Sequence, residues 1–324
     1  MRRAAIAFTL ALVALLAAAG LAQANPYPSR PIRMIVGFPP GGVVDVAARI
    51  VGDRLATLLG QPVVVENRPG ASGTLAAGIA AKAAPDGYTL FLCPGDLITL
   101  AALKPHMDFD PGAHLLPVAM ISSNPLVVVA NAQAPFNSIK EMLEAARTSS
   151  RALEYATPGR GTENHVVAEW MATAARVKLL HVPYSGGAAA SNGVAAGFVP
   201  LGIFSPPVVY PLIDAGKVKV LALTGKDRPP FLPASWPTLI ESGVSVDVAN
   251  WLGVFAPPAT PDHIVTRIDA ALAQVVQDAT VRKRMNDFGM APQYLGSAAF
   301  AAFIHADAAV YARIIRETGI QIGR

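Results

Sequence analysis

Two glycine-rich segments have the residue types and spacing of an anion-binding loop. They span residues 38–45 (FPPGGVVD) and 157–165 (TPGRGTENH). Each follows a short apolar run and precedes an amphipathic stretch, which is the pattern of a loop between a strand and a helix. Glycine allows a ligand to approach the backbone, and the first turn of a helix offers free N–H groups and a partial positive charge. Similar loops also serve only to turn the chain, so the pattern leaves both roles open.

Catalytic and nucleotide-binding motifs are incomplete or missing in the sequence. Residues 70–73 (GASG) are followed by Thr74 and so lack the last glycine of the G-x-S-x-G motif of hydrolases. No G-x-x-x-x-G-K-[ST] phosphate loop occurs, and the second glycine-rich segment has Asn164 where a dinucleotide fingerprint requires its third glycine. We therefore expect no enzymatic activity and no cofactor.

The histidines and the cysteine predict no metal site. The six histidines show no H-E-x-x-H or other metal-binding spacing. His165 is the one histidine that we consider for ligand contact, although holding its loop is the role that we favour. Cys93 is the only cysteine, so it cannot form an internal disulfide. We expect it to be a small buried apolar side chain, with an intermolecular bridge as the alternative.

The first 24 residues have the pattern of a secretory signal peptide. Two arginines follow Met1, residues 4–19 are small and apolar, and residues 22–24 (AQA) form a cleavage signal. We expect cleavage after Ala24 and export to the periplasm. Losing the two arginines lowers the formal charge from +4 to +2, and no later run of basic residues predicts a nucleic-acid partner. No later apolar stretch has the length typical of a membrane span.

The rest of the chain alternates between strand and helix patterns. Its 300 residues exceed what one core usually holds, so we expect two α/β domains. The order strand-helix-strand-helix-strand at the start predicts a parallel sheet. Strands are predicted at 32–36, 63–65, 88–93, 126–130, 153–156, 178–182, 201–204 and 218–223, with a last strand at 251–256. Helices are predicted between Gly42 and Gly60, at 74–84 and 139–148, from Thr162, Ala188 and Val208, and in three stretches after 256.

Helix-capping residues are predicted at three of these helices. Ser138 and Glu141 have the spacing of a capping box. Thr260 is expected to cap a helix whose first residue is Pro261, and Ser297 is expected to cap the terminal helix.

Several ordered motifs resemble those of the Bug-type substrate-binding proteins of tripartite tricarboxylate transporters. They are residues 27–33 (YPSRPIR), 38–42 (FPPGG) with Asp45, 66–73 (ENRPGASG), 85–90 (PDGYTL), 181–184 (HVPY) and 256–261 (APPATP). Together they cover essentially the whole mature chain. The resemblance implies a type II periplasmic binding protein, with two doubly wound α/β domains joined by a hinge. One domain would comprise residues 25–124 and 249–324, and the other would comprise residues 125–248.

The resemblance also implies a function. The protein would be a monomeric receptor without metal or catalysis that captures a small organic anion, usually a carboxylate, between its domains. It would deliver this ligand to the membrane subunits of a transporter. The alternatives are an orphan receptor that signals to a membrane sensor kinase and, from a third class, an exported α/β enzyme.

The two glycine-rich loops would hold the carboxylate from either side of the cleft. The positions carried over from the family are Pro40, Gly41, Gly42, Val43, Asp45, Thr157, Gly159, Gly161, Thr162 and His165, followed by Ser72, Gly73 and Tyr184. Family members commonly have Ser or Thr at the position of Val43 and often Lys at that of Ser185. Residues 93–96 and 198–200 depart from the family pattern as well, so the ligand itself is not identified.

Two charged residues in inferred loops are candidates for selectivity. Arg160 can pair with a second carboxylate through its planar guanidinium, and Asp96 can accept hydrogen bonds from an amine or a hydroxyl. The two can instead pair with each other and latch the cleft, or remain solvated loop charges.

Overall fold

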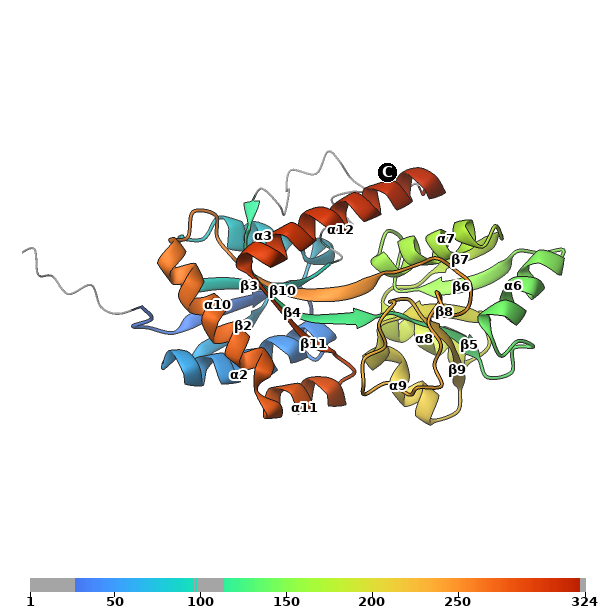
Figure 1. Ribbon diagram of the computed structural model, residues 1–324, viewed down its shortest axis with the longest axis horizontal. Coiled ribbons are helices and arrows are strands. Elements are labelled where there is room, and N and C mark those ends of the chain that lie inside the picture. Colours follow the sequence, from blue (N-terminus) through green and yellow to red (C-terminus); the bar gives the residue numbers. More distant parts are fainter. Residues whose placement is uncertain (1–26, 96, 98–113, 321–324) are drawn as a thin grey trace, which may run out of the picture.

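The protein forms two β-sheets that lie side by side along its long axis (Figure 1). The computed structural model describes residues 27–95, 97 and 114–320. The predicted signal peptide and Asp96 therefore lie outside the described residues. The first sheet has the strand order β11-β4-β10-β3-β1-β2, and the second has the order β7-β6-β8-β5-β9.

The first sheet is parallel only in part. Strand β1 pairs in parallel with β2 and β3, as the alternation of strands and helices predicts, whereas β10 runs antiparallel to β3 and β4. Its strands are β1 (Ile32–Val36), β2 (Val63–Asn67), β3 (Thr89–Pro94), β4 (Leu116–Pro125), β10 (Ala249–Ala256) and β11 (Pro292–Gly296).

Two strands of this sheet have no signal in the sequence analysis. Strand β4 ends in Ser-Ser-Asn-Pro, and β11 is a short edge strand bounded by Pro292 and Gly296. Pairing with their neighbours overrides these weak local propensities. The prediction that 251–256 is the last strand is therefore wrong, because β11 follows it.

The second sheet contains the predicted strands of the middle of the chain. Strand β6 lies parallel to β7 and β8, while β5 runs antiparallel to β8 and β9. The strands are β5 (Val127–Asn131), β6 (Leu153–Thr157), β7 (Leu179–Pro183), β8 (Leu201–Phe204) and β9 (Val218–Leu223).

Helices cover both faces of each sheet. The helices α2 (Val43–Leu59) and α10 (Asp262–Gln277) pack on one face of the first sheet, and α3 (Thr74–Ala81) and α12 (Ser297–Thr318) pack on the other. The second sheet lies between α6 (Ile139–Thr148) with α7 (Glu163–Ala174) and α8 (Gly187–Ala195) with α9 (Pro206–Asp214). Helix α11 (Ala279–Asp287) packs beside α2. Cys93 is buried in the core, as predicted.

Helix α12 connects the hydrophobic cores of the two sheets. Phe300 and Ile304 belong to the core of the first sheet, whereas Tyr311 and Ile314 belong to the core of the second. Figure 1 shows the helix, in red, passing from one sheet to the other. By length and composition alone, α12 is the one described helix that could cross a membrane. Its buried side chains instead fix it on the two cores.

The predicted caps agree with the structure at one helix out of three. Ser138 accepts a hydrogen bond from the Glu141 N–H at the start of α6. The Thr260 hydroxyl instead donates to the Pro257 carbonyl, and Pro261 is itself the N-cap of α10. The cap of α12 is Gly296, because the Ser297 hydroxyl donates to the Pro117 carbonyl of β4. Both hydroxyls donate to a nearby strand or turn carbonyl, and neither accepts a first-turn N–H of its helix.

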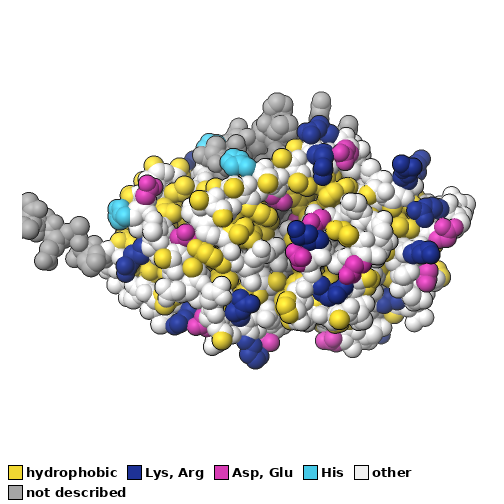
Figure 2. All heavy atoms as spheres, viewed as in Figure 1, with side chains coloured by type: hydrophobic (Ala, Val, Ile, Leu, Met, Phe, Trp, Pro, Cys, Tyr) yellow, Lys and Arg dark blue, Asp and Glu magenta, His cyan; other side chains and the backbone are white. Residues whose placement is uncertain are grey.

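Charges are mixed on the protein surface. On the face shown in Figure 2, basic and acidic side chains alternate over both sheets.

The contact between β10 and α12 predicts a sensitive glycine. A methyl group at Gly253 would lie 2.7 Å from Cε1 of the Phe300 ring, which is too close for two non-bonded carbon atoms. We expect Gly253→Ala to lower the free energy of unfolding by about 1–3 kcal/mol, as overpacking does. Chemical denaturation measures this change. Gly78→Ala on α3, where a methyl group meets open space, serves as the control and should not destabilise the protein. Equal stability of both variants would contradict the packing described.

Candidate functional site

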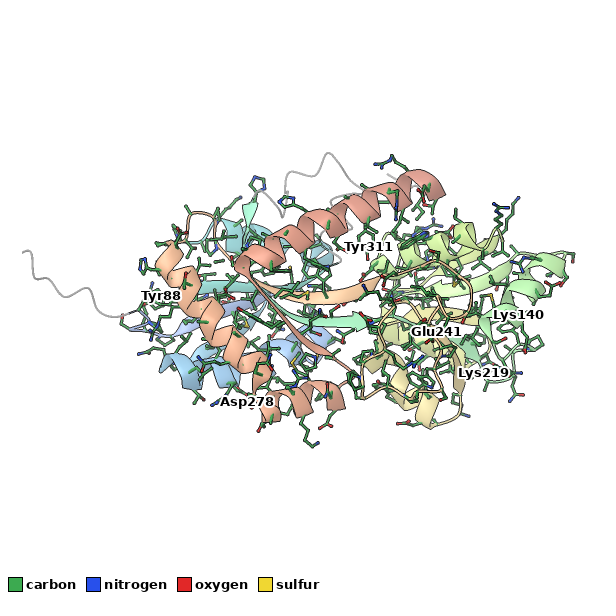
Figure 3. The ribbon with its side chains drawn as sticks, in the orientation of Figure 1. Tyr88, Lys140, Lys219, Glu241, Asp278 and Tyr311 are labelled. Carbon is green, nitrogen blue, oxygen red and sulfur yellow. The ribbon has the colours of Figure 1, made fainter. Side chains whose placement is uncertain are left out.

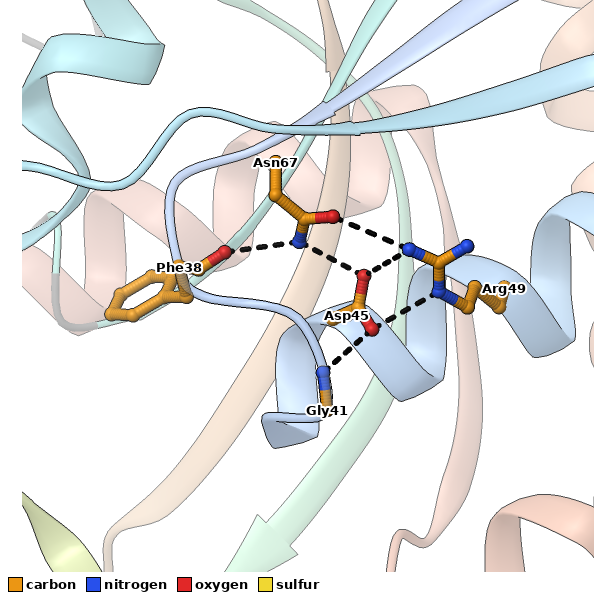
Figure 4. A network of polar contacts seen from close by, with 5 residues as sticks. All are labelled: Phe38, Gly41, Asp45, Arg49 and Asn67. Atoms are coloured by element: carbon orange, nitrogen blue, oxygen red, sulfur yellow. Dashed lines mark hydrogen bonds and ion pairs between the residues drawn. The ribbon is translucent and has the colours of Figure 1, made fainter.

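The first glycine-rich loop is held by a buried carboxylate. Asp45, in the first turn of α2, accepts hydrogen bonds from the Gly41 N–H at 2.9 Å, from Arg49 Nε at 3.0 Å and from Asn67 Nδ2 at 2.9 Å. Asn67 also donates to the Phe38 carbonyl at 3.0 Å (Figure 4). Residues from β2 and α2 thus clamp the loop at both ends, and Asp45 is turned toward the loop and α2.

These hydrogen-bond partners favour the ionised form of the Asp45 carboxyl over its neutral form. Burial alone would raise the pKa of the Asp45 carboxyl, but the hydrogen bonds from Arg49, Gly41 and Asn67 hold that pKa below its usual range. The carboxylate is therefore charged at neutral pH and fully engaged in holding the loop.

A close backbone contact brings residues 70–73 against the same loop. A side chain at Gly37 would lie 2.7 Å from Gly73 Cα, so two glycines are needed where the segments meet. Gly73 has φ +91° and lies against the Phe38 ring. Ser72, a predicted site residue, lies in the short 3-10 turn Ala71–Gly73.

The second glycine-rich loop uses its own side chains to bind its backbone. His165 Nδ1 accepts the Gly161 N–H at 3.1 Å, and Thr162 caps α7 by accepting the His165 N–H. Thr157, at the end of β6, lies 2.7 Å from His181 Nε2 through its hydroxyl and also accepts from the Gly159 N–H at 3.3 Å. Much of the hydrogen-bonding capacity that we expected for a ligand is used within the loop.

Two stacked histidines lie beneath this loop. The rings of His165 and His181 have centroids 3.9 Å apart. Burial, followed by the positive charge of Arg160, lowers the pKa of His165 to about 4. Burial, then His165 and Arg160, lowers the pKa of His181 to about 3. Both rings are therefore neutral at neutral pH, which suits His165 as a hydrogen-bond acceptor.

A second buried carboxylate joins the two sheets. Glu163, 1% exposed at the start of α7, accepts hydrogen bonds from Asn250 of β10 and from the Tyr311 hydroxyl of α12. Tyr311 is labelled in Figure 3, where α12 passes toward the second sheet. Glu163 therefore ties the second loop to a strand of the first sheet and to the connecting helix.

The remaining predicted residues are dispersed. Tyr184 packs its ring against α8 at Gly193, where no side chain fits. Arg160 is exposed at the tip of the second loop. Its predicted partner Asp96 lies outside the described residues, so the latch between them stays a prediction.

A pocket of about 560 Å³ lies between the first loop and the second sheet. Of the predicted residues, Gly41, Gly42 and Val43 line it. Its other wall comes from α8, α9 and the segment after α11, and not from the second glycine-rich loop. The lining residues are Gly41, Gly42, Val43, Val46, Gly187, Ala188, Ser191, Asn192, Pro207, Val208, Pro211, Leu212, Phe288 and Met290.

Helices α2 and α8 begin at this pocket, and neither has a side-chain cap. The N-caps of α2 and α8 are Gly42 and Gly186, and no described side chain accepts from the first-turn N–H groups of either helix. Side chains cap α6, α7 and α11 through Ser138, Thr162 and Asp278, whereas α3, α9, α10 and α12 lack a side-chain cap as α2 and α8 do. The first-turn N–H groups have no acceptor within their own helix. They are therefore available to an anion in the pocket.

A larger cavity of about 710 Å³ lies on α12 near the crossing of β4 and β10. Its walls include Asp307, which accepts a hydrogen bond from Trp251 Nε1 at 2.9 Å. Burial raises the pKa of Asp307 to about 6 despite that hydrogen bond. The other charged residues of the lining are mixed in sign: Lys226, Arg228 and Arg282 stand beside Asp227 and Asp247. In the described parts of the chain, no cluster of three or more His, Cys, Asp or Glu could hold a metal.

The sequence motifs predict Asp45 as a ligand-binding residue but not its role in positioning the first loop, and they do not predict Arg49, Asn67 or Glu163 as site residues. Asp45 and Arg49 have i,i+4 spacing on a predicted helix, so their ion pair could have been found. Asn67 stands in one of the quoted motifs, although its role there has no sequence signal. The contact between Glu163 and Tyr311 spans 148 positions, and it depends entirely on the tertiary fold.

Comparison with known proteins decides the family. A model described as the tripartite tricarboxylate transporter family receptor matches residues 47–320. The chain belongs to this family. The receptor is 32% identical over 313 residues to the protein BugT of Bordetella pertussis. The matched region covers 95% of this chain and 96% of BugT. The predicted resemblance is confirmed.

Solved structures confirm the fold class. Rpa4515 of R. palustris with adipate has a TM-score of 0.83 and 30% identity, covering 91% of the receptor and 99% of that chain. MatC of Rhodopseudomonas palustris with bound malate has a TM-score of 0.77 and 29% identity, covering 89% and 100%. The receptor is thus an α/β periplasmic binding protein with two sheets, and its family has a solute-binding and not an enzymatic role.

The Asp45 network predicts a loss of stability with a defined pH dependence. We expect Asp45→Asn to lower the free energy of unfolding by about 1–3 kcal/mol at neutral pH, because Arg49 and the Gly41 N–H lose a charged acceptor. The lowered pKa means that this contribution is complete above the ordinary aspartate pKa of about 3.9 and is lost as the pH falls through the folded value. The free energies of unfolding of the unchanged protein and of Asp45→Asn, taken from denaturation curves, should therefore converge in acid.

An exposed aspartate on the same helix provides the control. Asp53 of α2 pairs with Arg284 at 3.3 Å and is 68% exposed. Asp53→Asn should change the stability by less than about 0.5 kcal/mol. If the two variants are equally stable, Asp45 does not hold the loop as described.

The histidine pair predicts a second pH effect. Because both pKa values are lower in the folded chain than in the unfolded chain, the unfolded state binds more protons below pH 6.5. Stability should therefore fall as the pH decreases from about 6.5 to about 4, by at most about 1.4 kcal/mol per pH unit for each histidine. His181→Gln, whose amide can either donate to or accept from the Thr157 hydroxyl, should flatten this slope in calorimetric scans. The exposed His263→Gln should retain it, and an unchanged slope in His181→Gln would contradict the assignment.

Proposed function

We propose that the receptor captures a small organic carboxylate in the 560 Å³ pocket and delivers it to the membrane subunits of a tripartite tricarboxylate transporter. The observation that carries this proposal is the convergence of two uncapped helices, α2 and α8, on one pocket. No charged side chain of the described residues lines the pocket. The ligand's charge would therefore be balanced by backbone N–H groups.

The geometry suits a carboxylate. Hydrogen bonds to a charged acceptor contribute about 1.5–3 kcal/mol each, and a helix N-terminus adds about 0.3–1 kcal/mol at exposed sites. Helix α2 has 17 residues, and Asp45 already holds the glycine-rich loop that precedes it before a ligand arrives. The adipate and malate bound by the two related structures support the same ligand chemistry.

The proposal includes two domains that close on the ligand, with the boundaries predicted above. The chain crosses between the sheets at residues 125–126 and again before β10. The Thr224 hydroxyl accepts the Leu126 N–H at 2.9 Å and donates to the Val248 carbonyl at 2.7 Å, so one buried side chain joins both crossings. A hinge at these crossings would let the pocket open and shut. The signal peptide would direct export to the periplasm and be cleaved after Ala24.

A variant at the N-cap of α2 tests the proposal through two quantities: thermal stability, which should not fall, and carboxylate binding, which should fall. Gly42 has φ −76° and ψ 166°, which suits a capping side chain, and an added Cβ would meet only the Pro39 carbonyl at 3.4 Å. In Gly42→Asp, the new carboxylate should accept the first-turn N–H groups. We expect thermal stability to be retained or raised and carboxylate binding to fall at least tenfold, since the site is already occupied.

The measurement is native mass spectrometry of protein purified without denaturation, which identifies and quantifies any retained small molecule. Gly42→Ala distinguishes the effect of the charge from that of the side chain, and Gly78→Asp adds the same charge on α3, away from the pocket. Both should retain the ligand better than Gly42→Asp. A retained compound without a carboxylate, or full occupancy in Gly42→Asp, would refute the proposal.

A further inference from the structure

The side chains of the 560 Å³ pocket are almost entirely apolar. Its walls include Val43 and Val46 of α2, Val208 and Leu212 of α9, and Phe288 and Met290 after α11. Ser191 and Asn192 are the polar side chains among its described lining residues. The pocket therefore offers backbone N–H groups at one place and hydrocarbon elsewhere.

We propose that the receptor selects a monocarboxylate with an apolar body, either aromatic or branched aliphatic, over hydroxylated and dicarboxylic acids. This inference rests on the proposed function, since it assumes that the α2 N-terminus holds a carboxylate. The body of the ligand would then extend from α2 toward α9 and Phe288.

The exposure of the lining residues supports an apolar partner. Phe288 is 49% exposed, although it is a large aromatic residue at the edge of a concave site. Val43, Val46, Val208 and Leu212 are only half-buried. A ligand body that covers these side chains gains free energy from removing apolar surface from water. A hydroxyl in the same place would lose its hydrogen bonds to water without a replacement.

A second carboxylate meets no cationic side chain inside the pocket. No Lys, Arg or His of the described residues lines it, so a second buried charge would have to share the N–H groups of the α2 and α8 N-termini with the first. Arg160 lies in the second loop, which does not contribute to the lining. A dicarboxylate therefore binds well only if its second charge reaches solvent.

Val43 is the specificity-determining residue in this arrangement. It is the first residue of α2, so its side chain stands beside the N–H groups that hold the carboxylate. Its methyl groups face whatever substituent lies next to the carboxylate of the ligand. A hydroxyl at that carbon, as in malate, meets hydrocarbon instead of a hydrogen-bond partner.

Isothermal titration calorimetry of the mature chain tests the inference with four probes. Benzoate and 4-methylpentanoate have an apolar body and one carboxylate, malate has a hydroxyl and two carboxylates, and benzyl alcohol has no carboxylate. We expect both apolar acids to bind at least tenfold more tightly than malate, and benzyl alcohol to bind at least tenfold more weakly than benzoate.

Two isosteric variants test the role of Val43. Val43→Thr keeps the side-chain volume and adds a hydroxyl, so it should weaken benzoate binding and strengthen malate binding. The ratio of the benzoate affinity to the malate affinity should fall at least threefold. Val64→Thr makes the same change on the edge strand β2, where Val64 is 52% exposed and away from the pocket. It should leave both affinities unchanged.

The outcomes separate this inference from the proposed function. If malate binds more tightly than the apolar acids, the inference is wrong and the carboxylate receptor stands. An unchanged ratio in Val43→Thr would overturn the role of Val43. If benzyl alcohol binds as tightly as benzoate, or if none of the acids binds, the carboxylate site itself is wrong.

Discussion

The receptor depends on a buried carboxylate that faces away from the pocket where we propose that the ligand binds. Asp45 accepts hydrogen bonds from the Gly41 N–H, Arg49 and Asn67, and Asn67 in turn holds the Phe38 carbonyl. A site made of backbone N–H groups works only if the backbone is already in place, because ordering a glycine-rich loop at the moment of binding would cost conformational entropy. The strong charge of Asp45 is thus used for preorganisation, and the weaker charge of the helix N-terminus is left for the ligand.

The second sheet is positioned by the same kind of interaction. Glu163 receives hydrogen bonds from Asn250 of β10 and Tyr311 of α12, while Thr224 joins the two chain crossings. These contacts determine how far α8 and α9 stand from the first loop. The pocket therefore depends on buried polar residues at the seam, and the selectivity that we propose for it depends on the apolar residues that line it.

Local sequence patterns predict much of the fold but less of the site. The strands and helices with strong hydrophobic periodicity are where the patterns place them, as β1 and α2 illustrate. Strands β4 and β11 exist because neighbouring strands pair with them, and sequence windows do not contain that information. For the site, the pattern identifies both glycine-rich loops. It does not reveal that the second loop binds its own backbone through His165, nor that α8 forms the opposite wall.

The most direct test of this account is a crystal structure of the receptor with its tightest-binding carboxylate. The account predicts a carboxylate oxygen within hydrogen-bonding distance of the Val43 or Val44 N–H, with the body of the ligand between α2 and α9. A ligand in the cavity beside Asp307, or a carboxylate held by the Arg160 side chain with the α2 N-terminus unoccupied, would contradict it.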